Sequence, residues 1–257
     1  GTLLLTGIGP GILVALVLMA AVAILARRST LKTYPRAGLA DTGRAVWQAI
    51  PAMIMPAIIV GGIVSGFFTA TEAGVIAVAY GVLFALGTRR STLGQLAANL
   101  SDATIVSSSI MIILGGAALF GWIVAREGVP AMIAQWLQAT TDQAWVVMLL
   151  VLVVLLVVGI FIEPIPAMVM LVPVLQPIAD AYGFNPYHFA MVITFGVLLG
   201  SLTPPVAVLV LITCKIARVD VNRANRPLIA VFLCLVVALF LIAFVPWISL
   251  IAPRLLG

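Results

Sequence analysis

The stretch "LLGSLTPPVAVLVLI" (residues 198–212) decides the fold, because it breaks a helix inside a long apolar run. Pro204 and Pro205 lack a backbone N–H, and their rings disfavour helical geometry in the residues before them. Carbonyl oxygens one turn upstream are therefore expected to lose their hydrogen-bond partners. In hydrocarbon each such loss costs several kcal/mol unless protein, water or a ligand supplies a replacement. We therefore expect a ligand or polar group at this break.

The composition indicates that hydrocarbon is the environment of nearly the whole chain. Of 257 residues, 64% are hydrophobic and 8% are charged. The apolar runs are continuous rather than alternating, which is typical of membrane-spanning helices and excludes a β-barrel. The sequence therefore predicts an all-α polytopic membrane protein. The net charge of +5 does not indicate nucleic acid, because the basic residues lie in short connections between apolar runs.

The basic connections predict the topology. Apolar runs occur at 2–26, 46–66, 73–88, 103–124, 144–162, 165–179, 187–214 and 228–252. Basic residues concentrate in three connections, namely Arg27 to Arg44, Arg89 to Arg90 and Lys215 to Arg226. By the positive-inside rule these connections are cytoplasmic. A bacterial inner-membrane protein with a periplasmic C-terminus is predicted.

Crossing parity then requires an odd number of passages between residues 144 and 214. The run after the turn "GIFIEPIP" (159–166) is short and is interrupted by Pro173 and Pro177, and the turn itself carries no basic residue. We therefore expect 144–179 to form a re-entrant hairpin that dips part-way into the membrane. The discontinuous helix 187–217 follows it.

These two irregular segments form the candidate site. Carbonyl oxygens near Gly200 and the hydroxyl of Thr203 are hard donors that suit Na⁺, and the helix restarting at Pro205 directs its positive end toward the break. At the turn, Gly159 allows close backbone approach and Glu163 supplies an intramembrane carboxyl. Two structural alternatives remain open here: a simple proline kink, and a helix-start role for Glu163.

The remaining chemistry-bearing residues are few. His188 follows Asn185–Pro186 at the outer end of the broken helix and is expected to be an interfacial residue. Cys214 and Cys234 lie in apolar runs, and there is no Cys/His cluster, so no metal site beyond Na⁺ and no cofactor is predicted. A catalytic site would need a nucleophile and a base at membrane depth, which these residues do not supply. The protein is therefore not expected to be an enzyme.

Several motifs resemble the large membrane subunit of tripartite ATP-independent periplasmic (TRAP) transporters, in its C-terminal part. They are "TGIGPG" (6–11), "PAIIVGGIVSGFFTATEAGVIAVAYG" (56–81), "GIFIEPIPAMVMLVPVLQPIADAYGFNPYHFAMV" (159–192) and "GSLTPPVAVLVLI" (200–212). The resemblance covers nearly the whole chain. Many relatives have Gly after "TPPV", where this chain has Ala207, which adds a methyl group beside the proposed site.

The resemblance implies the permease subunit of a Na⁺-coupled secondary transporter that imports organic acid anions by an elevator mechanism. It also implies two partners, a small membrane subunit and a periplasmic substrate-binding protein. Residues carried over as sodium-binding are Gly159, Gly200, Thr203 and Val206. Residues carried over as substrate-binding or gating are Glu163, Ser201, Pro204 and Pro205.

The resemblance also implies a division of the chain and a missing part. Residues 1–101 would form scaffold helices, 102–226 a transport-type unit, and 227–257 a C-terminal transmembrane helix. The chain would be one half of an inverted-repeat elevator-type transporter. Because Arg27 and Arg28 follow the first apolar run, which is not the order of a signal peptide, we expect the chain to begin inside a longer protein.

The sequence leaves three alternatives to this function. A related anion symporter of the same inverted-repeat architecture would need no binding protein. An intramembrane enzyme and a non-transporting scaffold belong to different classes. Substrate identity and Na⁺ stoichiometry do not follow from the sequence.

Overall fold

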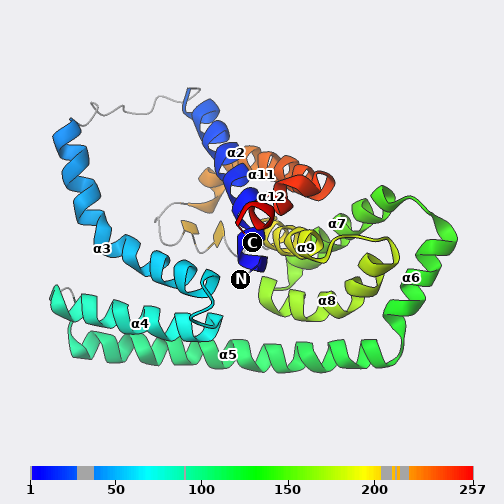
Figure 1. Ribbon diagram of the computed structural model, residues 1–257, viewed down its shortest axis with the longest axis horizontal. Helices are drawn as coiled ribbons and strands as arrows, with labels where there is room; N and C mark the ends of the chain where they lie inside the picture. Colours follow the sequence, from blue (N-terminus) through cyan, green and yellow to red (C-terminus); the bar gives the residue numbers. More distant parts are fainter. Residues whose placement is uncertain are drawn as a thin grey trace. The chain divides into compact units, whose positions relative to one another are not determined.

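The computed structural model describes residues 2–27, 38–89, 91–203, 210–211, 213–214 and 220–256, and these residues form helices joined by short connections (Figure 1). Pro204, Pro205, Val206 and Ala207 lie outside the described residues. The helices are α1 (Thr2–Thr6), α2 (Ile8–Arg27), α3 (Leu39–Val64), α4 (Ala70–Gly87), α5 (Leu93–Arg126), α6 (Val129–Thr140), α7 (Ala144–Phe161), α8 (Pro164–Ala181), α9 (Pro186–Gly200), α11 (Val221–Phe244) and α12 (Pro246–Leu256).

The described part of the chain has six helical segments that are long and apolar enough to cross a membrane, or seven if the bent pair α11–α12 is one span. The six are Thr2–Arg27, Leu39–Val64, Ala70–Gly87, Leu93–Arg126, Ala144–Phe161 and Pro164–Ala181. The predicted all-α polytopic membrane protein is confirmed. At about 1.5 Å per residue, α5 is about 50 Å long and exceeds a hydrocarbon core of about 30 Å, because its polar first half continues the helix.

The chain divides into two compact units, Gly1–Leu5 with Thr30–Ser109 and Thr6–Ser29 with Ile110–Gly257. In the first unit α3 and α4 pack as an antiparallel pair. The Tyr80 hydroxyl on α4 donates to the Pro51 carbonyl on α3 at 2.8 Å. The predicted division into a scaffold part and a transport part describes how the parts move. Packing does not test it, so it stays a prediction.

The turn between α3 and α4 explains the motif "GGIVSGFFTATEAG". The ring of Phe68 lies against Gly62, where any Cβ would clash with it. Gly66 has a φ of 76°, in the left-handed region that favours glycine. Thr69 then caps α4, because its hydroxyl accepts from the Glu72 N–H at 3.3 Å while the Glu72 carboxylate accepts from the Thr69 N–H at 2.8 Å. This reciprocal pair is a capping box.

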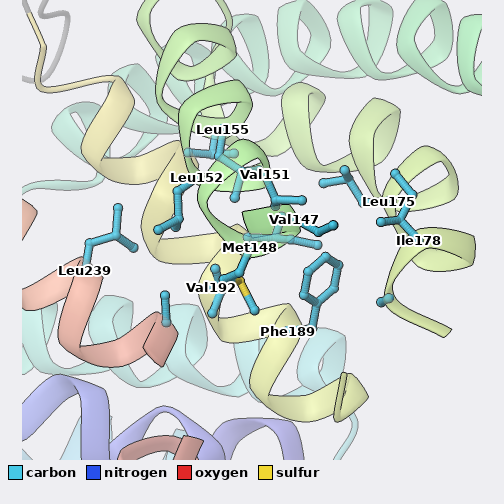
Figure 2. Close-up of a cluster of buried hydrophobic side chains, with 14 of the residues drawn as sticks. Val147, Met148, Val151, Leu152, Leu155, Leu175, Ile178, Phe189, Val192 and Leu239 are labelled. Atoms are coloured by element: carbon cyan, nitrogen blue, oxygen red, sulfur yellow. The ribbon is translucent and has the colours of Figure 1, made fainter. Parts of the chain in front are cut away.

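The second unit is built around α9, which packs against α7, α8, α11 and α12. Figure 2 shows the core that results, with side chains of α7 and α9 meeting between α8 and α11. The fully buried side chains of this core include Val147, Val151, Leu152, Leu155, Phe189, Val192 and Val197. The centre of the unit is therefore apolar.

The second arm of the predicted hairpin is one continuous helix. Pro173 and Pro177 both lie inside α8, so the expectation that they interrupt this arm is wrong. Pro173 cannot donate to the carbonyl oxygen of Val169, four residues before it. That carbonyl faces Gly121 of α5, where an added Cβ would lie 3.5 Å from the oxygen. A neighbouring glycine backbone thus covers the oxygen that the proline leaves without a helical partner.

Candidate ion-binding site

The last turns of α7 and α9 touch through two glycines. A Cβ added to Gly200 would lie 2.7 Å from the Cα of Gly159 and 2.7 Å from the carbonyl oxygen of Leu156. A Cβ added to Gly159 would lie 2.9 Å from the Cα of Gly200. Real Cβ atoms do not approach other atoms so closely, so both positions require glycine. The structure thus brings together two residues predicted to bind sodium.

One turn earlier the same two helices are again in close contact. A Cβ added to Gly196 would lie 2.9 Å from the Cβ of Leu155, which is fully buried. Gly196 and Gly200 therefore form a small-xxx-small face on α9, a pattern that lets helix backbones approach closely in membranes. This face sets the position of the α9 end against the α7 end.

The end of α9 is more fully hydrogen-bonded than the sequence suggested. Every carbonyl oxygen from Val197 to Gly200 accepts at least one hydrogen bond. The donors are the Ser201 N–H to Val197 at 3.1 Å, the Ser201 hydroxyl to Leu198 at 2.7 Å, the Leu202 N–H and Thr203 hydroxyl to Leu199 at 3.1 and 3.2 Å, and the Thr203 N–H to Gly200 at 2.9 Å.

The expectation that carbonyls near Gly200 lack partners is therefore wrong for the carbonyls of Val197 to Gly200. The Thr203 N–H replaces the donor that Pro204 removes from the Gly200 carbonyl, and the Ser201 and Thr203 hydroxyls donate to the Leu198 and Leu199 carbonyls upstream. A carbonyl oxygen has two lone pairs, and the Gly200 oxygen accepts one bond in the described structure. Its second lone pair can therefore coordinate a cation.

The carbonyl oxygens at the end of α7 are less fully hydrogen-bonded than those at the end of α9. The Ile162 N–H donates to the Val158 carbonyl at 3.0 Å, and this is the last such bond of the helix. The helical donor to Ile160 would be residue 164, which is a proline and has no N–H. Among the described residues no hydrogen bond reaches the carbonyl oxygens of Gly159, Ile160 or Phe161.

These two helix ends favour a cation over an anion. The C-terminus of a helix carries a partial negative charge, and here two C-termini converge at the Gly159–Gly200 contact. Their ligands are carbonyl and hydroxyl oxygens, which suit a hard ion. Within the described ranges no three His, Cys, Asp or Glu side chains come together as a metal cluster. The arrangement can therefore hold a monovalent cation through backbone oxygens.

The other predicted site residues occupy distinct positions. Glu163 is the residue before α8 and its carboxylate is exposed, with no capping hydrogen bond from its side chain. Ser201 is buried with its hydroxyl bonded to the α9 backbone, and Thr203 is half-buried. Pro204, Pro205 and Val206, as stated, lie outside the described residues. No substrate contact of any of these residues is established.

The position of His188 differs from the one predicted. Its ring is 2% exposed, and both ring nitrogens are hydrogen-bonded, so it is buried rather than interfacial. The signal was present in the helical spacing, because positions 188, 192 and 196 share one face of α9 and all three are buried.

A neighbouring cavity is unsuited to ions. It has a volume of about 280 Å³ and lies between α2, α9 and α11. Its lining is entirely apolar: Val14, Leu18, Phe195, Leu198, Leu199, Leu202, Leu235 and Leu239. It offers no ligand to a cation or an organic anion, so the oxygen-rich helix ends remain the candidate site.

The fold and the two facing helix ends define a class, the multi-pass helical membrane proteins, in which helix ends inside the membrane commonly serve as ion sites. The chain belongs to one family within this class, the DctM component of tripartite ATP-independent periplasmic transporters, because the sequence model of that family matches residues 1–248. Family and helices together make it a multi-pass inner-membrane protein.

Named relatives agree with this membership. The chain is 31% identical to a sialic acid TRAP transporter large permease protein from Vibrio cholerae, over 99% of this chain and 60% of the relative. It is 31% identical to a C4-dicarboxylate TRAP transporter large permease protein from Pseudomonas aeruginosa, over 100% of this chain and 60% of the relative. It is 31% identical to an ectoine/5-hydroxyectoine TRAP transporter large permease protein from Ruegeria pomeroyi, over 96% and 58%. The chain thus spans about 60% of the length of these relatives.

Proposed function

We propose that this chain is part of the permease subunit of a Na⁺-coupled secondary transporter that imports organic acid anions. The substrate is delivered by a periplasmic binding protein, and a small membrane subunit completes the transporter. The family and the relatives named as permeases support transport rather than catalysis. The substrates in the relatives' names, sialic acid, C4-dicarboxylates and ectoine, support small organic solutes as the cargo.

The observation that carries the proposal is the convergence of the α7 and α9 C-termini at Gly159 and Gly200. Two negative helix ends meet there without a side chain between the glycines, and the Gly159 carbonyl accepts no hydrogen bond among the described residues, which supports a Na⁺ site there. Thr203 adds a hydroxyl at the same helix end. Movement of this region across the membrane against a fixed scaffold is the elevator step that we propose.

Thr203 provides the test of the ion site. The complete permease, its small subunit and its binding protein are reconstituted in proteoliposomes, and uptake of radiolabelled organic acids is measured against Na⁺ concentration. Thr203→Ala is expected to raise the Na⁺ concentration for half-maximal uptake roughly tenfold, which corresponds to about 1.4 kcal/mol. Unchanged Na⁺ dependence would contradict the assignment of Thr203 to the site.

The matched control is Thr194→Ala on the same helix. The Thr194 hydroxyl also donates to the backbone four residues earlier, to Ala190 at 2.8 Å, and the residue is also half-buried. It lies about 9 Å from Gly200 along the helix axis, so its replacement is expected to leave Na⁺ dependence unchanged. A loss in both variants would indicate a general effect of removing a threonine hydroxyl from α9.

Dependence on the binding protein separates this proposal from a binding-protein-independent symporter. In the same proteoliposomes, uptake is expected only when the purified binding protein is added outside. Full uptake without it would favour the related symporter and contradict the tripartite assignment.

A further inference from the structure

The C-terminal apolar run is bent by 65° between α11 and α12. The cause is Pro246, which has no N–H to donate to the Ile242 carbonyl. The Val245 N–H still donates to Leu241 at 3.0 Å, and the Ile248 N–H donates to Val245 at 3.0 Å in a tighter turn. The helix therefore ends at Phe244 and restarts in a new direction.

His188 joins the two sides of this bend to the first turn of α9. Its Nε2 lies 3.1 Å from the carbonyl oxygen of Ala243, in the last turn of α11. Its Nδ1 lies 3.3 Å from the hydroxyl oxygen of Ser249 on α12, and Ser249 is fully buried. Because a carbonyl oxygen only accepts, Nε2 carries the proton. The His188 side chain thus replaces a helical donor to the Ala243 carbonyl of α11 and, through Ser249, holds α12 in place.

The α12 helix packs one face on the unit and exposes the other. Gly9 of α2 lies against the Ile248 carbonyl so closely that any Cβ there would clash. Ser249 and Ala252 are buried, whereas Trp247 is 60% exposed and Leu255 is 75% exposed. An apolar face that nothing in the described unit covers is therefore presented on the side opposite to α2 and α9.

Exposed aromatic side chains gather at this end of the unit. A cavity of about 290 Å³ is bounded by the start of α7, the α8–α9 turn and the α11–α12 bend, which places Trp145, His188 and Pro246 around one space. Trp145 is exposed, as are Tyr187 and Trp247, which are the chain neighbours of His188 and Pro246. Trp and Tyr are enriched where a membrane meets water.

The length and charge of the segment fix which surface this is. The apolar part of α11, residues 228–244, is about 25 Å long at about 1.5 Å per residue, which is at the lower end of the range of roughly 17–25 residues for transmembrane helices, whereas α12 is about 16 Å long and too short to cross. Four basic residues precede the apolar part of α11: Lys215, Arg218, Arg223 and Arg226. They favour a cytoplasmic start for α11 and an outer position for the bend.

We propose that α11 alone completes the last crossing, and that α12 lies along the outer membrane–water interface, held there by His188. The partner of its exposed face is the headgroup region of the bilayer. Trp247 and Leu255 enter the apolar boundary, and Arg254 at the helix end reaches the phosphates of anionic lipids. This assignment stands on the bend and the His188 contacts and does not depend on Na⁺ coupling.

Depth measurements test this position. Spin labels are placed singly on cysteines at Trp247 and Arg254 in the complete permease, in a cysteine-free background, and their depths in liposomes are measured by relaxation with oxygen and a nickel chelate. The two positions are two turns and about 10 Å apart along α12. The axis of α12 is inclined at 65° to that of α11. With α11 perpendicular to the membrane plane, the depths of the labels at positions 247 and 254 are expected to differ by about 4 Å or less.

The control pair is Leu233 and Phe240 on α11, which have the same spacing. Their depths are expected to differ by about 10 Å, because α11 crosses the membrane. A difference of about 10 Å between positions 247 and 254 as well would overturn the proposal and make α12 a continuation of the span.

The role of His188 is tested with the label at position 247. His188→Ala removes both hydrogen bonds and is expected to raise label mobility and to widen the depth difference along α12. His188→Gln retains a donor for the Ala243 carbonyl and is expected to restore most of the ordering. If mobility and depth are the same in all three proteins, His188 does not hold α12. The depths in the unmodified His188 background test the interfacial position even if a variant does not fold.

Discussion

Gly159 and Gly200 restrict the chemistry that is possible at the candidate site. With no side chain between Gly159 and Gly200, the candidate ligands are backbone oxygens and the hydroxyls of Ser201 and Thr203. Such ligands discriminate by ion size and charge rather than by specific hydrogen bonding. A residue required for packing thus also determines which ligands the candidate site offers.

The packing requirement at Gly200 gives a first prediction. Gly200→Ala forces a methyl group against the Gly159 Cα and the Leu156 oxygen, so it is expected to lower the free energy of unfolding by about 1–3 kcal/mol. The measurement is denaturant unfolding of the complete permease in detergent. Gly11→Ala on α2 is the control, because a Cβ there meets no atom within 4 Å. It is expected to be neutral or stabilising; equal losses in both variants would contradict the close contact.

At the scale of elements, the α3–α4 turn shows how a short motif can be explained without a binding role. Gly62 admits the ring of Phe68, Gly66 supplies the left-handed residue, and Thr69 with Glu72 caps α4. Each residue type follows from local geometry. The conspicuous acidic residue Glu72 therefore has a structural role in this turn.

The cap gives a second prediction. Thr69→Ala leaves the Glu72 N–H without its capping oxygen and is expected to destabilise the protein by about 1 kcal/mol. Thr71→Ala, in the first turn of the same helix, removes an exposed hydroxyl and is expected to change stability little. Thermal unfolding midpoints of the two variants, compared in one detergent, check this. A larger shift for Thr71→Ala would contradict the capping role of Thr69.

The helices themselves were predictable, because their apolar runs are long and continuous. Their boundaries were less so: α5 begins ten residues before its apolar run, since the polar segment that starts at Leu93 is also helical. Pro173 and Pro177 suggested a break that does not occur, because a tertiary neighbour covers the freed oxygen of Val169. Contacts between distant segments decide such cases, and a single sequence does not display them.

The candidate site, like the helices, was predictable only in part. The pairing of Gly159 with Gly200 was expected from the two irregular segments, and the structure brings them together. The hydrogen bonds that close the end of α9 were not expected, because they depend on the rotamers of Ser201 and Thr203. The burial of His188 was missed because its partners, Ala243 and Ser249, lie in a segment far along the chain.

For the whole molecule, the sidedness of the C-terminus is the property that remains to be measured. The basic connection Arg27 to Arg44 predicts that Arg44, in the first turns of α3, is cytoplasmic, and the basic stretch Lys215 to Arg226 predicts that Arg254, near the end of α12, is periplasmic. A cysteine at Arg254, in the headgroup region, is therefore expected to react with an impermeant maleimide in right-side-out vesicles, and a cysteine at Arg44 only after the membrane is permeabilised. The opposite pattern would invert the topology.

The glycine contact also limits how this protein can change its sequence. When two side chains clash in a core, a smaller residue at one position usually accommodates a larger one at the other. Gly159 and Gly200 have no smaller alternative, so neither can compensate for a substitution of its partner. A saturation library at these two positions would therefore yield no functional pair other than the original, and suppressors of either substitution would have to arise by shifting a whole helix.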